Sequence, residues 1–520
     1  MKVTGDTVPA ALARVAHTHA DRPAVLDGDT ALSWSELSDR VHLAAAGLLA
    51  LGVDAGDAVA FWSPNTWHWM VGALAAHHVG AAVVPINTRY TGAEAQDVLA
   101  RTGARVLLVA GTFLGTDRSD ALDFDLLPDL AAVVRIRIEP DDAGPARPGP
   151  AVHGWEALGG PRSGAELDRV REYSDAVTPT TVADILFTSG TTGRSKAVAC
   201  SHGQSLASSL AWARCAELTH EDRYLVVNPF FHSFGYKAGI LTCLQTGAML
   251  IPHATFDPAR VLQTIEARAV TVLPGPPTLY RTLLDHPDRG SHSLNSLRIA
   301  VTGAATVPVS LIDEMGSQLC FDTVLTAYGL TESGGFATMC RPGDDTGTVS
   351  TTSGRAMGDY EVSIAETGEV LVRGPGVMHG YLDDDAATEA TLDADGWLHT
   401  GDIGSMDERG NLRITDRLKD MYICGGFNVY PAEVEQRILT LGGIREVAVI
   451  GTPDTRLGEV GAAIVVLDPS GSAPSEAEII EHCRGALANF KVPRAVHVRS
   501  ELPRNASGKV LKNQLREELS

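Results

Sequence analysis

One short segment gathers the groups that could hold a polyphosphate. It combines hydroxyl side chains with two glycines and two cations, in the order Thr188, Ser189, Gly190, Thr191, Thr192, Gly193, Arg194, Ser195, Lys196. Glycine lets backbone N–H groups approach a ligand closely, and successive N–H groups in such turns form concavities that bind anions. The segment therefore predicts a loop that binds a nucleotide triphosphate. Taken alone, it could also be an exposed hairpin without a ligand.

The spacing of this loop differs from that of a Walker P-loop, which needs Gly-x-x-x-x-Gly-Lys-Ser/Thr entering a helix. Here Gly190 and Gly193 are three residues apart, and Lys196 follows Arg194 and Ser195. The stretches before and after the loop, 183–187 and 197–200, are apolar and partly β-branched, which indicates a strand on each side. We therefore expect a strand, the loop and a second strand.

Four further segments carry groups suited to the same chemistry. Each combines an aromatic ring, a carboxylate, a cation or a glycine pair with a turn, and together with the loop they occur in a specific order. They are Tyr328, Thr331 and Glu332 in 326–333; Asp402 at the end of 396–402; Arg417 and Lys419 in 416–420, followed by Gly425 and Gly426; and Lys509 at the end of 503–509.

Composition limits the class of protein and its partners. The chain has 520 residues, too many for one hydrophobic core, and 44% hydrophobic with 20% charged residues is typical of a globular protein. A formal net charge of −22 argues against nucleic acid or an anionic membrane as a general partner.

The start has no apolar signal region. The apolar stretch 71–86 is too short to span a bilayer, so we interpret it as a buried helix. Seven scattered cysteines without a C-x-x-C motif favour reduced thiols in a cytoplasm.

Hydrophobic patterning predicts an α/β fold. Helical runs alternate with short apolar strands on both sides of the loop, which is typical of layers around a largely parallel sheet. The Pro- and Gly-rich stretch 139–179 is predicted to be a surface excursion. The expected helices are 34–51, 203–218 and 258–267, and the expected strands are 58–61, 81–84, 224–228, 270–273 and 298–301.

Two later regions show a different pattern of apolar and polar residues. Residues 360–415 show short alternating β segments with glycine turns, which predicts a small β-barrel or distorted sheet. The last hundred residues predict a compact α+β unit with a basic tail. Its expected elements are helices at 431–441 and 474–488 and strands at 447–450 and 462–467.

With these motifs in this order, the chain resembles the acyl-adenylate-forming superfamily, which includes acyl-CoA synthetases, luciferases and the adenylation domains of peptide synthetases. The resemblance covers nearly the whole length. It implies a large N-terminal domain, 1–418, of layered α/β subdomains with a β-barrel-like subdomain, and a small mobile α+β C-terminal domain, 419–520. Residues 228–239 and 416–431 look most like the CoA ligases of bacterial steroid degradation, which activate the propionate carried by methyl-hexahydroindanedione.

The resemblance implies a two-step reaction. A carboxylate and ATP give acyl-AMP and pyrophosphate, and the thiol of CoA then gives acyl-CoA and AMP. In such a site the loop wraps the β- and γ-phosphates, Thr331 meets the α-phosphate, and Thr191 and Glu332 hold Mg²⁺. Adenine lies between Tyr328 and the wall formed by Gly303 and Ala304. Asp402 accepts hydrogen bonds from the ribose hydroxyls, and Arg417 donates to ribose or phosphate. Core packing for Tyr328 and a surface salt bridge for Asp402 are the alternatives.

The second domain would supply the groups that change between the two steps. By resemblance, Lys509 bridges the substrate carboxylate and the α-phosphate during adenylation, and rotation about Lys419 then withdraws it. Gly425 and Gly426 would then face the pantetheine arm of CoA. Arg89 and Lys491 are either contacts of the CoA phosphates or ordinary surface cations.

The identity of the acid would be decided around His232. The resemblance implies a gate between the nucleotide and acyl pockets, whereas a lone histidine beside aromatics is otherwise more often a core residue. No acid lies between Phe230 and Gly239, which disfavours an amino-acid substrate. Lys237 could meet a substrate carbonyl or face solvent. The aromatic side chains suited to an apolar ring system are Phe231, Phe234 and Tyr236.

These observations predict a cytoplasmic ATP-dependent acid:CoA ligase acting on the indanedione propionate, with Mg²⁺ as cofactor and ATP and CoA as co-substrates. The alternatives are a ligase for medium- or long-chain fatty or aryl acids, an adenylating enzyme that loads a carrier protein, and a non-enzymatic nucleotide sensor. The chain ends soon after Lys509 without a carrier domain, which favours a free thiol acceptor. We expect no nucleic-acid partner and no stable membrane insertion, and we include a homodimer among the expectations.

Overall fold

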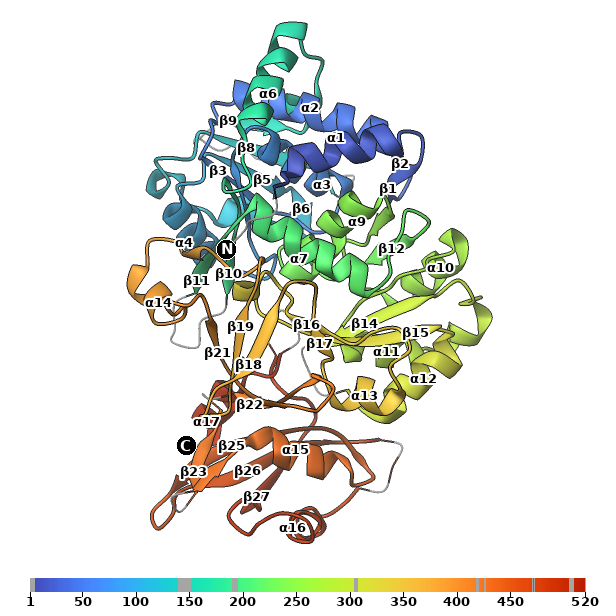
Figure 1. Ribbon diagram of the computed structural model, residues 1–520, viewed down its shortest axis with the longest axis vertical. Coiled ribbons are helices and arrows are strands. Elements are labelled where there is room, and N and C mark those ends of the chain that lie inside the picture. Colours follow the sequence, from blue (N-terminus) through green and yellow to red (C-terminus); the bar gives the residue numbers. More distant parts are fainter. Residues whose placement is uncertain are drawn as a thin grey trace.

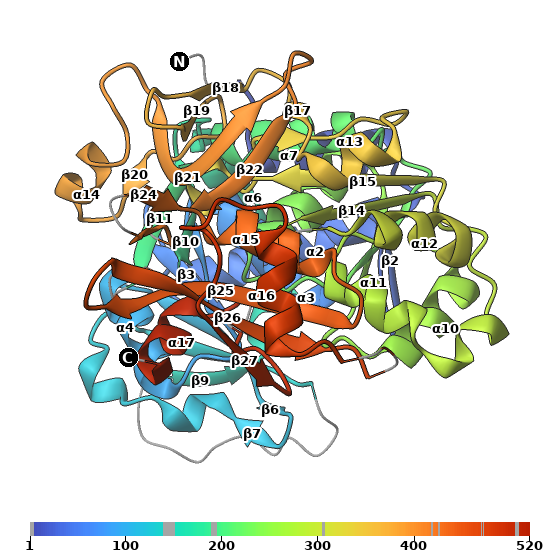
Figure 2. The ribbon, with the colours of Figure 1, turned by 90° about the horizontal axis from the view of Figure 1, so that it is seen from below.

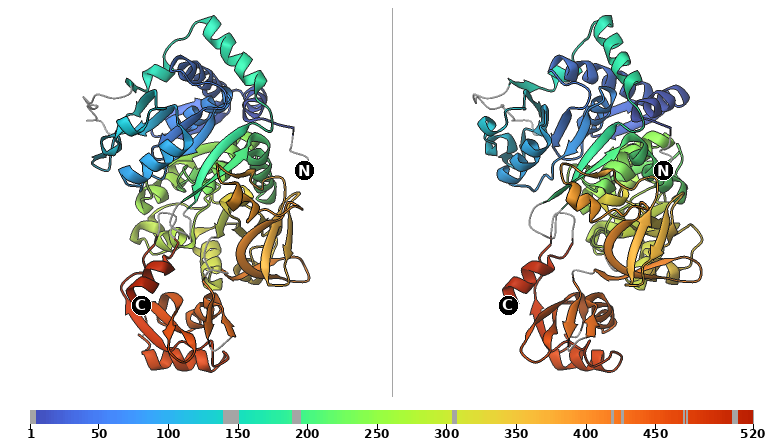
Figure 3. Two further views of the ribbon diagram at one scale, coloured as in Figure 1. Left: turned by 90° about the vertical axis from the view of Figure 1, so that its left-hand side faces the viewer. Right: turned by 60° about the vertical axis from the view of Figure 1, so that its left-hand side comes forward.

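The structure is a computed structural model that describes residues 5–138, 151–188, 195–303, 307–417, 420–424, 427–469, 471, 473–504 and 509–519. The elements up to β22 form a large upper part, and the elements after it form a small lower part (Figure 1). In the view from below, the small C-terminal sheet lies across the lower face of the large part (Figure 2). The two side views show the same division (Figure 3).

An eight-stranded sheet forms the first layer of the large part, in the order β20-β11-β10-β4-β3-β5-β8-β9. The strands from β10 to β9 pair in parallel, whereas β11 is antiparallel to both of its neighbours. The central strands are continuous apolar runs because both faces of the sheet are buried. The strands are β3 (Ala58–Trp62), β4 (Ala82–Pro85), β5 (Val106–Ala110), β8 (Ala132–Ile136), β9 (Ala151–Gly154), β10 (Val182–Thr188), β11 (Lys196–Ser201) and β20 (Gly380–Tyr381).

A second layer consists of two four-stranded sheets, β12-β13-β1-β2 and β14-β15-β16-β17. Val272 joins them through single bridges to Tyr224 and Ile299, so the strand predicted at 270–273 is reduced to this bridge. The strands are β1 (Pro23–Asp27), β2 (Thr30–Ser33), β12 (Arg223–Val226), β13 (Met249–Pro252), β14 (Ile299–Gly303), β15 (Thr323–Tyr328), β16 (Thr338–Met339) and β17 (Arg355–Ala356).

Helices cover these sheets and begin at residues that cap them. Ser33 and Glu36 form a capping box at the start of α2, and Thr91 and Glu94 do the same for α4. Helices α10 to α12 and the short helix α13 (Thr346–Thr351) flank β14 and β15 (Figure 1). The helices of the large part with eight or more residues are α1 (Val8–Thr18), α2 (Trp34–Ala50), α3 (Trp67–His78), α4 (Gly92–Thr102), α6 (Gly164–Ala176), α7 (His202–Cys215), α10 (Pro258–Arg268), α11 (Pro277–Leu284) and α12 (Val309–Leu319).

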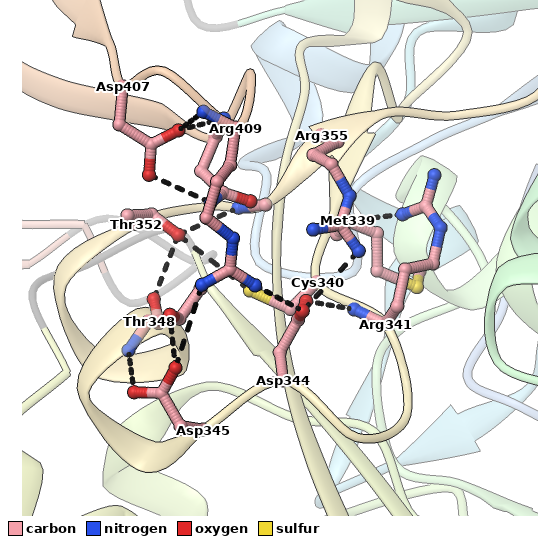
Figure 4. A network of polar contacts seen from close by, with 12 residues as sticks. Met339, Cys340, Arg341, Asp344, Asp345, Thr348, Thr352, Arg355, Asp407 and Arg409 are labelled. Carbon is pink, nitrogen blue, oxygen red and sulfur yellow. Dashed lines mark hydrogen bonds and ion pairs between the residues drawn. The ribbon is translucent and has the colours of Figure 1, made fainter.

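A four-stranded antiparallel sheet follows, as the glycine-punctuated β texture predicts. Its order is β18-β19-β21-β22, with strands Glu361–Ile364, Glu369–Arg373, Leu398–Met406 and Leu412–Arg417. A polar network attaches it to the second layer (Figure 4). The buried carboxylate of Asp344 pairs with Arg355 at 3.3 Å and with Arg409, in the turn between β21 and β22, at 3.5 Å. This network places β21 beside the end of β15.

The C-terminal part has its own core. Strands β25 and β26 alternate apolar side chains between the two faces of a sheet, so that Val449 and Val465 pack on one side and Ile450 and Ile464 on the other. Such separate cores are typical of a domain. Its elements are β23 (Tyr422–Cys424), β24 (Phe427–Val429), α15 (Pro431–Leu439), β25 (Ile444–Asp454), β26 (Gly458–Leu467), α16 (Glu476–Arg484), β27 (Ala495–Arg499) and α17 (Lys512–Leu519). The predicted division between 418 and 419 lies outside the described residues and stays a prediction.

Three expectations about elements need correction. The apolar stretch 71–86 is not one helix, because α3 ends at His78 and the chain continues into β4. The predicted surface excursion 139–179 contains α6 and β9, which extends the eight-stranded sheet. The basic tail contains β27 and α17. Among the described residues, no helix is long and apolar enough to cross a membrane.

Candidate active site

The ends of the phosphate loop are held by the strands that flank it. β10 and β11 are antiparallel, and Thr188 faces Lys196 in their last pair. The guanidinium of Arg101, on α4, donates to the Ser195 carbonyl at 2.8 Å. The structure therefore confirms the predicted strand on each side of the loop. The loop residues outside the described part of the chain are Ser189, Gly190, Thr191, Thr192, Gly193 and Arg194.

Glu332 lies close to the exit of this loop. It belongs to a 3₁₀ turn, Thr331–Ser333, that follows β15. The hydroxyl of Tyr381 donates to Glu332 Oε1 at 3.0 Å, and Lys196 Nζ lies 4.4 Å from the centroid of the same ring. The fold thus brings the loop and the predicted metal carboxylate together, although Lys196 and Glu332 are 136 positions apart in the sequence (332 − 196).

Tyr328 and Asp402 form a contact that the sequence could not show. The Tyr328 hydroxyl donates to Asp402 Oδ2 at 2.6 Å, and Asp402 is buried at 2% exposure. Tyr328 is the last residue of β15, and Asp402 pairs with Arg417 across β21 and β22. The neighbouring strands therefore bring the three predicted nucleotide contacts into one region. The side chain of Arg417 lies outside the described part of the structure.

Gly303 lies beside this pair, at the end of β14. It faces Ala327 in the parallel register of β14 and β15. A Cβ atom at Gly303 would lie 2.3 Å from the Ala327 carbonyl oxygen, so only glycine fits. A flat backbone surface at this position is compatible with the adenine wall expected from Gly303 and Ala304. Ala304 itself lies outside the described residues.

The predicted acyl-gate segment follows β12 and enters a π-helix at Tyr236–Leu241. Phe231 and Phe234 are half-buried. The Phe234 ring packs edge-on against Trp212, with centroids 5.5 Å apart, and lies 6.3 Å from Phe336. Trp212 and Phe336 were not singled out from the sequence, because they lie in α7 and after the Thr331–Ser333 turn, without a motif of their own.

Tyr236 does not join this aromatic group as expected. It is fully buried, and its hydroxyl lies 2.6 Å from His77 Nε2 on α3. Packing against Trp69 completes its surroundings in the core. We therefore leave Tyr236 out of the acyl pocket.

Lys237 also differs from both alternatives that the sequence left open. It is fully buried, and its Nζ lies 3.1 Å from Asp184 Oδ1 on β10. Ser205 Oγ donates to the other oxygen of Asp184 at 2.5 Å. Burial is the largest single influence and lowers the pKa of Lys237. The charges of Asp184 and Cys200 and the hydrogen bonds to both together outweigh it and hold the pKa above its ordinary value. Lys237 is therefore a partner within the core and faces neither substrate nor solvent.

His232 belongs to the large part of the molecule and is influenced by a charge from the small C-terminal part. Its Nδ1 accepts a hydrogen bond from the Phe234 N–H at 3.2 Å. The ring is accessible from outside, yet protein surrounds it closely. Burial and, to a smaller extent, the charge of Lys509 lower the pKa of His232 to about 4. The ammonium of Lys509 therefore lies within electrostatic reach of His232.

The structure describes only two of the residues predicted to contact CoA, Arg89 and Lys491. Arg89 is exposed between β4 and α4. Lys491 Nζ lies 2.6 and 2.7 Å from the two carboxylate oxygens of Glu433. Gly425, Gly426 and the predicted hinge Lys419 lie outside the described residues.

The donor set near the loop fits Mg²⁺. Within the described part of the chain, no group of three or more His, Cys, Asp and Glu side chains could hold a metal. Mg²⁺ prefers hard oxygen ligands and commonly keeps waters and substrate phosphates besides one or two carboxylates. A single carboxylate at Glu332 beside a phosphate loop matches this requirement.

Comparison with known proteins identifies the family of the chain. The AMP-binding enzyme family matches residues 12–382, and the AMP-binding enzyme C-terminal domain matches 433–509. The chain therefore belongs to the AMP-binding enzyme family.

Individual relatives and a solved structure are similar to the chain over nearly its whole length. The chain is 60% identical to the 3-[(3aS,4S,7aS)-7a-methyl-1,5-dioxo-octahydro-1H-inden-4-yl]propanoyl:CoA ligase of Mycobacterium tuberculosis, over 98% of both chains. It is 54% identical to the ligase of the same name from Rhodococcus jostii, again over 98% of both. The crystal structure of ATP-bound MatB from Rhodopseudomonas palustris matches with a TM-score of 0.82 at 29% identity, over 99% of both chains.

Proposed function

We propose that the protein is an ATP-dependent acid:CoA ligase that activates the propionate side chain of the methyl-dioxo-octahydroindene acid named in its relatives. The observation that carries the identity of the acid is 60% sequence identity over 98% of the chain. The electrostatic influence of Lys509 on His232 supports the reaction type, because the predicted catalytic cation then lies near the predicted gate.

The first step would be attack of a carboxylate oxygen on the α-phosphorus of ATP, with pyrophosphate as the leaving group. The protein has little covalent work to do, so positioning and charge stabilisation dominate. We assign the loop from Thr188 to Lys196 to the leaving phosphates, and Lys509 to the carboxylate and the α-phosphate. Mg²⁺, held by Glu332 with Thr191, would neutralise phosphate charge, while Thr331 would contact the α-phosphate.

The nucleoside would bind between β14, β15 and β21. We assign the Tyr328 ring to adenine, with Gly303 and Ala304 opposite, and Asp402 with Arg417 to the ribose hydroxyls. The buried Asp402 carboxylate already accepts one hydrogen bond from Tyr328. It keeps further lone pairs for a ribose hydroxyl.

The acid would lie beside His232, against Phe231 and Phe234. Trp212, which is buried, packs behind Phe234 and against the buried ring of Phe336. Large aromatic side chains suit a rigid apolar ring system.

In the second step the thiol of CoA would attack the acyl-AMP and release AMP. We assign Gly425 and Gly426 to the pantetheine arm, Arg89 and Lys491 to the CoA phosphates, and Lys419 to the hinge. Lys491 would first have to leave Glu433. A cytoplasmic location and a homodimer belong to the same proposal, and light scattering on the purified protein tests the second.

The decisive experiment is a panel of acids with ATP, Mg²⁺ and CoA, read by the acyl-CoA formed. The panel contains the indanedione propionate, octanoate, palmitate and an aryl acid such as ferulate. We expect kcat/KM for the indanedione propionate to exceed every other value by at least about 100-fold, since several methylene-sized differences in a pocket combine. A straight-chain or aryl acid that matches it would contradict the assignment, and a carrier protein that replaces CoA would change the acceptor.

A further inference from the structure

Tyr381 lies between two charged groups of the proposed site and has no role in the reaction as described so far. Its hydroxyl donates to Glu332 Oε1 at 3.0 Å, and Lys196 Nζ lies 4.4 Å from the centroid of its ring. A hydrogen bond to a carboxylate and a cation above an aromatic face are both favourable. One side chain therefore contacts the exit of the phosphate loop and the metal carboxylate.

The backbone around Tyr381 is attached to the same two elements. In β20, Tyr381 faces Val198 of β11, and the Leu382 N–H donates to the Ala197 carbonyl at 2.8 Å. On the other side, the Met378 N–H donates to the Glu332 carbonyl at 2.8 Å. The segment 378–382 thus connects the strand that leaves the loop with the turn that carries Glu332.

The side chain of Tyr381 is held firmly. It is 7% exposed, and the Thr391 side chain also hydrogen-bonds to it. Its own N–H donates to Thr388 Oγ1 at 2.9 Å. Burial and, secondly, the charge of Glu332 raise the pKa of Tyr381 above its ordinary value, so the hydroxyl stays a proton donor at neutral pH.

We propose that Tyr381 is a positioning residue that orients the Glu332 carboxylate for the divalent cation of the nucleotide and holds Lys196 at the exit of the phosphate loop. The hydrogen bond uses one carboxylate oxygen and leaves the other for the cation. This inference rests on the proposed function, because it takes the ligand of the loop to be a nucleotide with its metal ion.

The main test is Tyr381→Phe, which removes the hydroxyl and keeps the ring beside Lys196. Mn²⁺ serves as the probe, and its binding to the protein with α,β-methylene ATP is followed by electron paramagnetic resonance without acid or CoA. We expect the affinity for Mn²⁺ to fall about 10-fold, the effect of losing one hydrogen bond to a charged group. In turnover assays the Mg²⁺ requirement should rise by a similar factor, while KM for the acid stays unchanged.

A second variant separates the two contacts. Tyr381→Leu also removes the ring, so we expect it to weaken binding of α,β-methylene ATP in EDTA, whereas Tyr381→Phe should bind it as the wild type does. Tyr360→Phe is the matched control: Tyr360 is buried, and its hydroxyl donates to the Ser333 carbonyl of the same turn at 2.9 Å without contacting Glu332. It should lower thermal stability and leave the Mn²⁺ affinity unchanged.

Three outcomes overturn the inference: wild-type Mn²⁺ affinity in Tyr381→Phe, an equal loss in Tyr360→Phe, or a wild-type protein that binds no Mn²⁺ with the nucleotide. The last outcome also removes the proposed function. If the wild type binds Mn²⁺ and Tyr381→Phe binds it more weakly, but no acid is converted, the proposed function fails while the role of Tyr381 stands.

Discussion

A hydrogen bond and an electrostatic interaction carry the proposed site at the scale of the residue. Tyr328 donates to Asp402, and Lys509 lies within electrostatic reach of His232. In each interaction the two residues are far apart in the sequence. Their roles depend on orientation, which a hydrogen bond or a nearby charge provides.

The contact between Tyr328 and Asp402 leads to a prediction about ribose. Tyr328→Phe keeps the ring for adenine and removes the hydrogen bond that orients the buried carboxylate. We expect the affinity for ATP to fall about 10-fold. Calorimetry with ATP and with 2′-deoxy-ATP measures it, and the loss should be smaller for the deoxy nucleotide, which lacks one of the hydroxyls that Asp402 would bind. An equal loss for both nucleotides would separate Tyr328 from ribose recognition.

The role of Lys509 leads to a prediction about the two half-reactions. Lys509→Ala should lower the rate of acid-dependent pyrophosphate release by at least about 100-fold, because it removes the charge that stabilises the transition state. The attack of CoA on supplied acyl-AMP should largely survive. Rapid-quench assays of each half-reaction check this result, and an equal loss in both would refute the assignment.

The same variant should change the titration of His232. Its pKa is lowered to about 4, first by burial and then by Lys509. Removing the positive charge should raise this pKa, but burial should keep it below the ordinary value of about 6.5. NMR titration of the labelled histidine, assigned with His232→Asn, measures the change. An unchanged pKa would mean that Lys509 stays away from the gate in solution.

At the scale of the element, a buried ion pair joins the phosphate-loop strand to the acyl-gate helix. Asp184 lies on β10, which runs into the loop, and Lys237 lies on the π-helix that follows His232. Both side chains are fully buried, and Ser205 of α7 donates to the same carboxylate. We expect this pair to fix the position of the proposed acid site relative to the proposed phosphate site.

The ion pair predicts strong coupling in a double-mutant cycle. Lys237→Met should lower the free energy of unfolding by about 3–5 kcal/mol, because it leaves Asp184 buried without its partner. Asp184→Asn in the same chain should restore a large part of this loss, since no charge then stays buried. Urea unfolding of the wild type, both single variants and the double variant measures the coupling. Additive losses would show that the two side chains do not interact.

At the scale of the whole molecule, stability should depend on buried histidines. His77, His78, His202 and His253 are all at most 4% exposed. Burial lowers the pKa of His78 and His253 to about 4 and that of His202 to about 3, and it lowers the pKa of His77 well below its ordinary value. In the unfolded chain each histidine would titrate near 6.5.

The predicted consequence is a loss of stability in acid. Well above pH 6.5 these histidines are neutral in both states, so they add no pH dependence there. As the pH falls towards 4, the unfolded chain binds protons that the folded chain refuses, and each histidine lowers stability by up to about 1.4 kcal/mol per pH unit. Urea unfolding between pH 7.5 and 5 should show the midpoint urea concentration falling with pH. His253→Asn should reduce the number of protons taken up on unfolding at pH 5.5 by about one. A constant midpoint would contradict the burial of these rings.

The sequence predicted local elements well where apolar periodicity and turn residues agree. The strands around the phosphate loop, α2 and the antiparallel sheet of 360–415 are examples, since each depends on neighbouring residues. It failed where pairing partners are distant. Residues 151–154 become β9 only because β8 offers a free edge, and residues 270–273 are reduced to one bridge at Val272 between two sheets.

The sequence by itself determined the chemistry: the loop from Thr188 to Lys196, Glu332, Asp402 and Lys509 indicate acyl adenylation through their types and order. Only the tertiary structure decided which side chains face one another. In the structure the side chains of Tyr236 and Lys237 point into the core. Tyr381 lies between Lys196 and Glu332, and Lys509 lies within electrostatic reach of His232. The physical reason is that residue type and spacing specify local backbone and available groups, whereas burial and orientation arise from packing between elements far apart in the chain.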